Sequence, residues 1–402
     1  MNEELLKVSF TELLPQEERI EVQRKKQKLQ IGVPKETFMQ EKRIGLSPEG
    51  VHLLTSNGHE VVIESGAGLG ARYTDKDYSD AGAQIAYSTK EVFEKQIILK
   101  IEPPSDEELE MMKMGQTLIS ALQVKTRSQA YFKSLMSKKA TAIAVENITD
   151  DEGMLPIMRC MSEIAGSASV QLGAELLTGE NGKGYLFGGI TGVPQTEVVI
   201  IGAGTVGTYA AKSAIALGAN VKVFDTSLSR LKRMQQYLKS PVYTCVLQPK
   251  LLEKALRRCD VAIGAIRSTS GRTPCVVTEE MVQKMKAKSV VIDISIDHGG
   301  CFETSEITSL SNPTFEKYNV IHYCVPNIAS RFARTASFAL SNIFAPLLLT
   351  ISDEGGIEET LRYHPEIRTG LYMHKGVLAS PALGEWFDLP YSHPDLFFGN
   401  IH

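Results

Sequence analysis

Short apolar runs alternate with helical patterns along the first third of the chain. Five of these runs have the length of a buried strand: 29–33, 61–64, 97–101, 117–122 and 140–145. Helical periodicity fills the intervals between them, for example over residues 48–56, before Asn57-Gly58. Because parallel strands need crossover connections, this alternation predicts a doubly wound parallel sheet.

A second series of strand and helix patterns follows. Its apolar runs lie at 198–201, 221–224, 261–264, 290–294 and 320–323. Two long helical patterns, 161–178 and 329–349, bracket this series, and the chain after about residue 340 is expected to rejoin the first sheet. The pattern therefore predicts an α/β fold with two doubly wound parallel-sheet domains joined by two long helices.

The most informative motif stands directly after the first strand of the second series. Gly202, Gly204 and Gly207 form the pattern G-x-G-x-x-G, with Thr205 and Val206 between the last two glycines. The first glycine allows a tight turn, the second lets the backbone approach a pyrophosphate, and the third lets helix and strand pack closely. A helix that begins here would offer N–H donors and its positive dipole end to phosphates. These five residues are the predicted cofactor-binding loop.

The next predicted strand, 220–224, ends at Asp225, 18 residues after Gly207. An acid at this place can accept hydrogen bonds from a ribose diol, and its charge would repel the 2′-phosphate of NADP. The second domain is therefore predicted to be a Rossmann domain that binds NAD.

These patterns also give domain boundaries. Residues 1–28 are charged and amphipathic and predict a helical N-terminal extension. Residues 29–160 and 340–402 are predicted to form a Rossmann-like domain without a glycine fingerprint, which binds the substrate. Residues 161–339 are predicted to form the NAD-binding domain with its linking helices. A cleft between two such domains would let two ligands meet.

Composition narrows the class of protein. The chain has 402 residues, 43% of them hydrophobic and 22% charged, with a net charge of −4, so nothing indicates a nucleic-acid or anionic-membrane partner. The six cysteines form no CxxC pair and no metal-ligand spacing, which favours reduced thiols, a cytoplasmic protein and no metal site. The most apolar segment, 338–351, is shorter than a membrane span.

Ligands of open parallel sheets bind outside the carboxyl ends of the strands, and this rule selects candidate site residues. It selects Arg43. Either its guanidinium holds a carboxylate with two hydrogen bonds, or Arg43 is a solvated surface arginine. In the second domain it selects Asp297 and His298, as cofactor-facing or proton-carrying groups or as parts of a turn. Ser162 either caps the helix that follows it or faces the cofactor.

Several motifs, in one order along nearly the whole chain, resemble the alanine dehydrogenases and the related NAD-binding subunit of proton-translocating transhydrogenase. The motifs are IGVPKET with Arg43 downstream, SPEGVHLLTSNGHEVVIESGAG, MSEIAG at 161–166, GGITGV, VVIDISIDHGGCFE at 290–303, HYCVPNIAS and TASFALSN. MSEIAG is similar to the dehydrogenases rather than to the transhydrogenase subunit.

The resemblance implies oxidative deamination of L-alanine with NAD, giving pyruvate, ammonium and NADH. It also implies that Arg43 holds the substrate carboxylate and that Asp297 lies near the nicotinamide and the attacking water. Asn327 matches the loop that closes on the substrate, Asp225 matches the ribose ligand, and Ser162 matches a cofactor-contacting serine. The family usually forms hexamers or dimers, so a homo-oligomer is expected.

Two positions depart from the family pattern. The family motif K-x-K-E-P has a substrate-binding lysine two residues after the lysine that matches Lys100, and here that position is Glu102. The acid/base histidine of the family is matched by Gln123, which can orient a ligand but cannot exchange a proton near neutral pH. Either Glu102 pairs with Arg43 and weakens carboxylate binding, or it receives a cationic group. Neighbouring Lys100 or Lys125 could supply the lost cation, although a strand neighbour normally faces the other way.

The sequence therefore leaves more than one function open. The leading hypothesis is an NAD-dependent dehydrogenase of L-alanine or another small amino or 2-oxo acid, with Asp297, His298 and Glu102 as the remaining proton acceptors. A second is a non-catalytic NAD(H)-binding protein. A third is a secondary-amine dehydrogenase of the saccharopine dehydrogenase kind.

Overall fold

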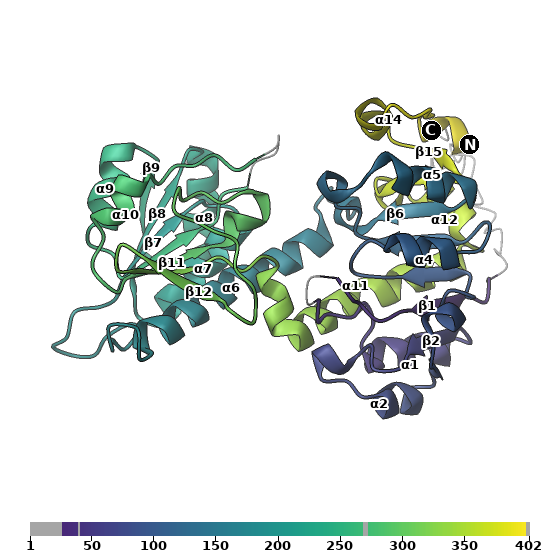
Figure 1. The fold of residues 1–402 in the computed structure, drawn as a ribbon, viewed down its shortest axis with the longest axis horizontal. Coiled ribbons are helices and arrows are strands. Elements are labelled where there is room, and N and C mark those ends of the chain that lie inside the picture. The colour runs from purple at the N-terminus through teal and green to yellow at the C-terminus, as the bar shows by residue number, and fades with distance from the viewer. Residues whose placement is uncertain (1–25, 39–40, 268–271, 399–402) are drawn as a thin grey trace, which may run out of the picture.

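The computed structural model describes residues 26–38, 41–267 and 272–398. They form two α/β lobes side by side, and the long helices α6 (Pro156–Thr178) and α11 (Ala333–Asp353) run between them (Figure 1). The predicted fold class is confirmed. The predicted N-terminal extension lies outside the described residues except for 26–28, which are not helical.

The first lobe is built on an eight-stranded sheet with the order β15-β14-β6-β5-β4-β1-β2-β3. Its strands are β1 Gln30–Val33, β2 Glu60–Glu64, β3 Gln84–Ala86, β4 Ile97–Leu99, β5 Thr117–Ser120, β6 Thr141–Ala144, β14 Leu371–His374 and β15 Val377–Leu378. β14 runs antiparallel to β6 and to β15, so this sheet is mixed rather than wholly parallel as predicted. The chain does rejoin the first sheet after α11.

The second lobe contains a seven-stranded sheet with the order β12-β13-β11-β10-β7-β8-β9. Its strands are β7 Glu197–Ile201, β8 Asn220–Asp225, β9 Tyr243–Val246, β10 Val261–Gly264, β11 Val290–Asp293, β12 Thr314–Lys317 and β13 Val320–Tyr323. Only the edge strand β12 is antiparallel to its neighbour. The order reverses beside β7, so the loop after β7 lies at a topological switch point, where doubly wound sheets bind ligands.

Helices cover both sheets. Those of the first lobe are α1 Pro48–Ser56, α2 Asp75–Asp80, α3 Thr89–Val92, α4 Asp106–Met111, α5 Gln129–Ser137, α12 Ile357–Tyr363, α13 Pro365–Arg368, α14 Pro381–Phe387 and α15 Asp395–Phe398. Those of the second are α7 Thr205–Ala216, α8 Leu228–Leu238, α9 Pro249–Leu256 and α10 Glu279–Gln283. Short 3₁₀ turns follow several strands: η2 Leu69–Ala71, η3 Val124–Thr126, η4 Val145–Asn147, η5 Ile294–His298 and η6 Ile328–Phe332.

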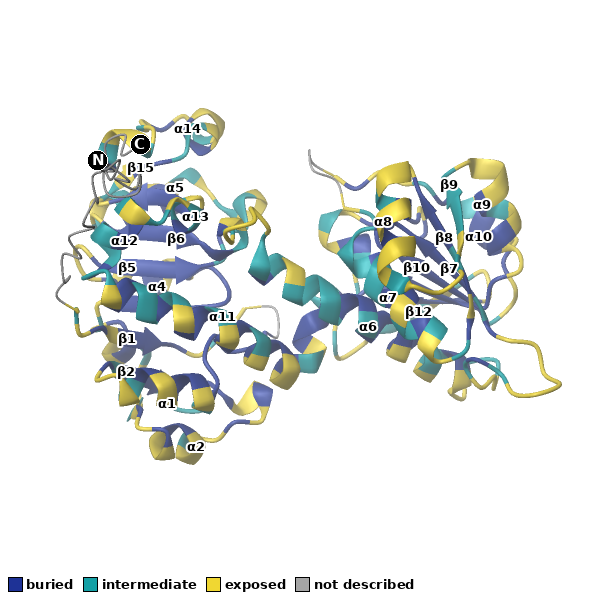
Figure 2. Ribbon diagram, turned by 180° about the vertical axis from the view of Figure 1, so that it is seen from behind, coloured by how far each residue is buried: buried dark blue, intermediate teal, exposed yellow. Residues whose placement is uncertain are grey.

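The central strands are buried on both faces (Figure 2), which explains why they are continuous apolar runs rather than alternating patterns. Local sequence also sets the helix boundaries. At α1 the side chain of Ser47 accepts a hydrogen bond from Gly50 N, and Pro48 occupies the first turn, where its missing N–H costs nothing. These signals explain why the predicted helix 48–56 agrees with the structure.

The helical stretch Ile328–Asp353, η6 followed by α11, is long and apolar enough by composition to cross a membrane. The sequence pattern showed only the shorter apolar run 338–351 and did not indicate the full length of this helical stretch. However, 56% of its most apolar window is buried inside the protein. Leu340, Phe344 and Leu348 belong to the core beneath the first sheet, and Ser341 approaches Ser47 at the start of α1. This helix is therefore a core element of the first lobe.

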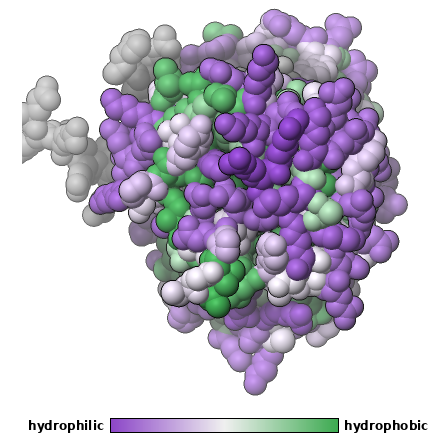
Figure 3. Space-filling model, turned by 90° about the vertical axis from the view of Figure 1, so that its left-hand side faces the viewer, coloured by the Kyte–Doolittle hydropathy of each residue, from purple (hydrophilic) through white to green (hydrophobic). Residues whose placement is uncertain are grey.

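The face of the second lobe turned away from the first is mostly hydrophilic, with apolar residues in small groups (Figure 3). Such scattered apolar side chains are normal on a protein surface.

Candidate functional site

The glycine loop after β7 has the backbone geometry that a dinucleotide site requires. Gly202 has a φ of +117°, and a Cβ there would lie 2.4 Å from the carbonyl oxygen of Ala265. A Cβ on Gly207 would lie 1.8 Å from the carbonyl oxygen of Gly202. Around Gly204, by contrast, the Cβ position is open: apart from Gly204 and the residues next to it in the chain, no described residue has an atom within 4 Å. The first and third glycines are thus required by the fold, whereas the second leaves space for a ligand.

The loop leads directly into α7, whose first turn begins at Thr205 and has no side-chain cap. The N–H groups of this turn are therefore available to an anion. Asp225 stands at the end of β8 and is buried. One of its carboxylate oxygens accepts a 2.7 Å hydrogen bond from Ala203 N and the other a 2.7 Å bond from Ser227 N. Asp225 thus fixes the glycine loop, a contact that the sequence did not reveal.

Helix α6 packs closely against α7 beneath this loop. A Cβ on Gly166 would lie 2.3 Å from the carbonyl oxygen of Val206, so only glycine allows this approach. The helix begins at Pro156, six residues before Ser162. The capping interpretation of Ser162 is therefore wrong, because Ser162 lies inside the helix and not at its start. Its contact with a cofactor stays a prediction.

At the C-terminal edge of the first sheet, Arg43 is buried and is held by Glu41. The guanidinium donates from Nε to Glu41 Oε1 at 2.8 Å and from NH2 to Oε2 at 2.6 Å. Its third nitrogen, NH1, faces the sulfur of Met161 at 3.3 Å, and sulfur is a weak acceptor. Arg43 is therefore not a solvated surface residue, and one edge of its guanidinium remains open to a better acceptor.

Glu102 lies on another side of the same guanidinium, with Oε1 at 3.8 Å from Arg43 NH2. Its other carboxylate oxygen accepts a short hydrogen bond from the Gln123 amide. Burial and the nearby Glu41 raise the pKa of Glu102 to about 7, although Arg43 opposes the shift. Glu102 thus pairs only weakly with Arg43, and the structure brings Arg43, Glu102 and Gln123 together.

Gln123 has a left-handed backbone conformation with a φ of +48°. The conformation is fixed by Glu146, whose Oε1 accepts hydrogen bonds from Leu122 N at 2.9 Å and from Gln123 N at 3.2 Å. A non-glycine residue in this region is uncommon and is frequent at functional sites. The role of Glu146 was not predicted from the sequence, because it depends on a contact with Gln123, which lies 23 residues earlier in the chain.

Lys100 does not replace the cation that the family pattern places at position 102. Its ammonium is buried and lies 2.8 Å from Glu108 and 3.3 Å from Glu36. Lys100 therefore does not supply the lost positive charge, since two carboxylates already engage it. Lys125 is exposed.

The second lobe contributes Asn327 and Asp297 to the same site. Asn327 Nδ2 donates to Glu41 Oε2 at 2.6 Å, and its backbone N–H donates to Asp297 Oδ1 at 2.9 Å. Ser330 Oγ adds a 3.1 Å hydrogen bond to Glu41 Oε1. Glu41, which lies two residues before Arg43, therefore contacts both Asn327 and Ser330 of the second lobe. Sequence reasoning treated it only as part of a charged loop.

The remaining titratable groups of η5 differ in environment. Desolvation raises the pKa of Asp297, while the hydrogen bond from Asn327 and the charge of Arg43 oppose it. Burial, together with Arg267 and Lys125, lowers the pKa of His298, which favours the neutral imidazole. Among the described residues, no group of three His, Cys, Asp or Glu side chains could hold a metal ion.

Two family models match almost the whole chain. Residues 32–165 match the N-terminal domain of alanine dehydrogenase/PNT, and residues 169–381 match its C-terminal domain. The chain belongs to the alanine dehydrogenase/PNT family. The resemblance that the motifs indicated is confirmed.

Individual relatives agree with this family. The chain is 40% identical over 365 residues to an alanine dehydrogenase of Methanococcus maripaludis, covering 90% of this chain and 97% of that one. It is 38% identical over 366 residues to an alanine dehydrogenase of Staphylococcus haemolyticus, covering 90% and 98%. The chain is thus homologous to alanine dehydrogenases, a family of NAD-dependent amino-acid dehydrogenases.

Solved structures show the same fold. An L-alanine dehydrogenase superposes with a TM-score of 0.83 at 38% identity, covering 89% of this chain and 99% of that one. A transhydrogenase from Sinorhizobium meliloti superposes with a TM-score of 0.75 at 24% identity, covering 88% and 99%. The second likeness concerns the fold alone.

Proposed function

We propose that this chain catalyses the NAD-dependent oxidative deamination of a small L-amino acid, with L-alanine as the first candidate. The observation that carries the proposal is the meeting of Arg43, Glu102 and Gln123 at the edge of the first sheet, where Glu41 connects them to Asn327 of the second lobe. Family membership gives the reaction class, and these side chains give the chemistry at the substrate.

In this proposal the second lobe binds NAD. Gly202, Gly204 and Gly207 shape the loop, and the N–H groups of Thr205 and Val206 face the pyrophosphate. The open space at Gly204 and the uncapped start of α7 support this assignment. Two further residues, Ser162 and Asp225, are proposed to contact the cofactor. Although both oxygens of Asp225 already accept one N–H, a carboxylate has further lone pairs for ribose hydroxyls. When bound, NAD accepts the hydride.

The substrate carboxylate is proposed to bind the open NH1 edge of Arg43. This edge faces Met161 sulfur, which a carboxylate can displace as the stronger acceptor. Glu41 holds the opposite edge, so the guanidinium is already oriented when substrate arrives. Asn327 is proposed to contact the substrate from the second lobe.

Glu102 is proposed to receive the substrate ammonium and to accept its proton. A pKa of about 7 suits this exchange, because a base is most effective when its pKa is near the working pH. Gln123 orients the carboxylate through its short hydrogen bond. A carboxylate at position 102, where the family pattern has a lysine, then favours an amine over a carbonyl oxygen as the substrate group bound there.

Asp297 is proposed to orient the water that attacks the imine, and the neutral His298 is the second candidate for this step. The net reaction converts L-alanine, NAD⁺ and water to pyruvate, ammonium, NADH and one proton. Hydrolysis of the imine carbon–nitrogen bond releases the ammonium and leaves the oxygen of water in the 2-oxo acid.

A non-catalytic NAD(H)-binding protein is the second candidate function. The observation that favours it is the bidentate Glu41–Arg43 pair. Glu41 already accepts hydrogen bonds from Nε and NH2 of Arg43, the residue proposed to bind the substrate carboxylate, and a second acid stands at position 102. Under this alternative the lobes and the cofactor loop are retained, but no substrate is turned over.

The test is NADH formation by the full chain with NAD at alkaline pH, across a panel of L-amino acids that includes L-alanine. We expect NADH, ammonium and pyruvate in equal amounts with L-alanine. Turnover of a different amino acid without turnover of L-alanine would change the proposed substrate and leave the proposed reaction class unchanged. NADH binding by fluorescence without any turnover would favour the non-catalytic alternative, and failure to bind NAD(H) would contradict both functions.

A further inference from the structure

Four polar side chains follow four neighbouring strands of the first sheet, at its carboxyl edge. The strands β6, β5, β4 and β1 are neighbours in this order. The residues that follow them stand in the same order along the chain ends: Glu146, Gln123, Glu102 and Arg43. Three of them belong to the candidate site, whereas Glu146 is farthest from Arg43 in this order. What Glu146 contributes to the site depends on its contacts with the next member.

Glu146 contacts this next member through the backbone. Its Oε1 accepts hydrogen bonds from Leu122 N at 2.9 Å and from Gln123 N at 3.2 Å. Leu122 is buried, and an N–H group there without an acceptor would be costly. Gln123 has a φ of +48°, a conformation that is unfavourable for a residue with a Cβ. The two hydrogen bonds of Glu146 therefore help to hold Gln123 in this conformation.

The position of Gln123 in turn decides where its amide lies. Gln123 Nε2 donates a short hydrogen bond to Glu102 Oε2, and a donor at this place favours the ionised carboxylate. The pKa of Glu102 is raised to about 7 by burial and by the charges of Glu41 and Glu36, while Arg43 and the Gln123 amide oppose the shift. The amide is thus one of two groups that keep Glu102 able to ionise near neutral pH.

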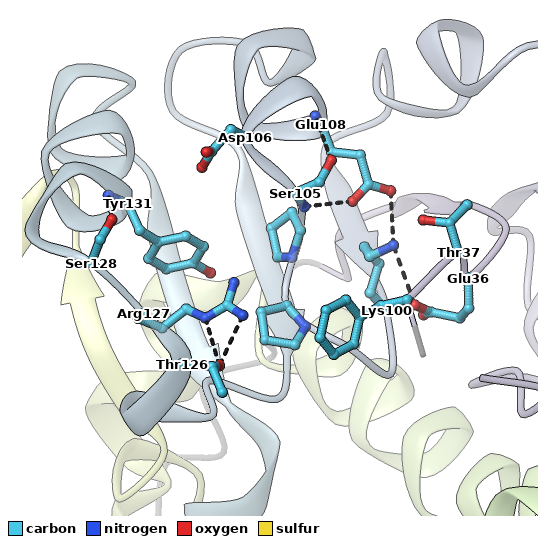
Figure 4. A pocket seen from close by; sticks show the side chains of 13 residues that line it. Glu36, Thr37, Lys100, Ser105, Asp106, Glu108, Thr126, Arg127, Ser128 and Tyr131 are labelled. Carbon is cyan, nitrogen blue, oxygen red and sulfur yellow. Dashed lines mark hydrogen bonds and ion pairs between the residues drawn. The ribbon is translucent and has the colours of Figure 1, made fainter. Parts of the chain in front are cut away.

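The main chain before Glu102 has anchors of its own. Glu36 Oε1 accepts a 2.6 Å hydrogen bond from Ile101 N, and Glu36 Oε2 pairs with the Lys100 ammonium at 3.3 Å (Figure 4). Glu36 and Lys100 also line a cavity of about 360 Å³ beside this segment. Since these contacts do not involve Glu146, a change at Glu146 should affect the side chain of Glu102 and leave its backbone in place.

We propose that Glu146 is a positioning residue for the oxidation of the amino acid. By holding the backbone of Gln123, it places the amide that holds the carboxylate of Glu102. This inference rests on the proposed function, in which Glu102 accepts the proton of the substrate ammonium. Glu146 acts on the reaction through Gln123 and exchanges no proton itself.

The test is the pH profile of kcat/KM for amino-acid oxidation by the full chain carrying Glu146→Met. Methionine has a similar length, but its sulfur is only a weak acceptor for the two N–H groups. The Gln123 amide should then lose its place, and the pKa of Glu102 should rise. The lower limb of the profile, the fall in rate as the pH drops through about 7, should move upward by roughly one pH unit.

The direction of this shift separates positioning from charge. Removing a negative charge near Glu102 favours its ionisation and moves the lower limb to lower pH, which is opposite to the expected shift. The charge of Glu146 also acts on Tyr131 and Tyr372. Burial raises the pKa of both phenols, so they stay neutral while Glu102 titrates.

Glu146→Gln is the conservative variant. Its amide oxygen can accept the same two N–H bonds. Its NH2 group would replace Oε2, which is buried and accepts no hydrogen bond from the described residues, so no donor there opposes the amide. The lower limb of Glu146→Gln should therefore stay close to that of the wild type.

Two further variants test the path and the specificity. Gln123→Gly removes the amide but can keep the left-handed backbone, and it should shift the lower limb about as far as Glu146→Met. The double variant should show no further shift, because both changes remove the same contact. Asp150→Ala is the matched control. Asp150 is an exposed carboxylate that accepts hydrogen bonds from Glu152 N at 3.1 Å and from Met154 N at 2.8 Å in another loop, so its loss should leave the limb unchanged.

The proposal is overturned if Glu146→Met leaves the lower limb in place or moves it downward, or if Glu146→Gln shifts it as far as Glu146→Met. Additive shifts in the double variant with Gln123→Gly would also overturn it. If Glu146→Met does not fold, Glu146→Asp replaces it: the shorter side chain keeps the charge but withdraws the acceptor, so an upward shift is again expected and an unchanged limb contradicts the proposal.

A readout without turnover keeps this proposal separate from the proposed function. Carboxyl ¹³C NMR of chains labelled at glutamate follows the titration of Glu102, whose signal is the one absent from Glu102→Gln. Its midpoint should move upward in Glu146→Met, and an unchanged midpoint contradicts the positioning role. Absence of turnover by the wild type, by contrast, speaks against the proposed function alone.

Discussion

Two carboxylates beside one guanidinium have opposite pKa shifts. Although burial raises the pKa of Glu41, Arg43 outweighs this effect and holds it at about 2, because two hydrogen bonds join the pair. The pKa of Glu102 rises to about 7, because burial and Glu41 outweigh a single 3.8 Å contact with Arg43. The same cluster thus contains a permanent anion that orients Arg43 and an acid that can exchange protons.

The buried Glu41–Arg43 pair should be strongly coupled in stability. Arg43→Met leaves the Glu41 carboxylate buried without its partner, and we expect a loss of about 3 kcal/mol or more. Glu41→Gln should also be destabilising, and the double variant should lose much less than the sum of the single variants. Urea unfolding of the wild type, the two single variants and the double variant measures this double-mutant cycle. Glu253→Gln, in an exposed pair with Arg257, is the control and should change little. Additive losses would contradict the proposed coupling.

Elements that the sequence could predict are those with strong local signals. The ten predicted strands are present within two residues of their predicted bounds, because central parallel strands are continuous apolar runs. The short edge strands β3, β9 and β12 were missed. Residues 314–317, for example, pair only with β13 and are not fully buried, so they carry no apolar run. β14 was missed because a strand that returns late in the chain has only long-range partners.

The glycine loop gives a prediction at this scale that separates folding from binding. Gly204→Ala should leave the melting temperature nearly unchanged, because the Cβ position is open, but should weaken NAD binding by roughly tenfold or more, since a pyrophosphate needs that space. Gly207→Ala should lower both stability and affinity, because its Cβ would clash with the carbonyl of Gly202. Thermal melts and NADH fluorescence titration measure the two effects. Equal NAD affinity in Gly204→Ala and wild type would contradict the assignment of the loop.

At the scale of the whole molecule, the candidate site exists only because two lobes meet. Sequence reasoning could place Arg43, Glu102, Gln123, Asp297 and Asn327 at strand ends, since doubly wound sheets bind ligands there. It could not show that Glu41 accepts hydrogen bonds from both Arg43 and Asn327, which lie 284 positions apart in the chain. Nor could it show that Lys100 is already paired. Both facts depend on side-chain geometry across long sequence separations.

Asn327 should therefore matter for catalysis more than for folding. Asn327→Ala removes the hydrogen bond to Glu41 that joins the lobes, and we expect kcat/KM for the amino acid to fall by roughly tenfold or more. NAD affinity and the unfolding midpoint should change little, since the glycine loop is not touched. Asn312→Ala, an exposed asparagine in the same lobe, is the matched control. Unchanged kcat/KM in Asn327→Ala would argue against a site shared by the lobes.

The most direct test of the account is the pH profile of kcat/KM for amino-acid oxidation by the wild type and by Glu102→Gln. A base must be ionised to accept a proton, so the wild-type rate should fall as the pH drops through about 7, the pKa of Glu102. Glu102→Gln should have a much lower kcat/KM. Its pH profile should lack the lower limb, that is, the decrease in rate as the pH drops through about 7. A lower limb that persists unchanged in Glu102→Gln, or an unchanged rate, would contradict the role of Glu102 as the proton acceptor.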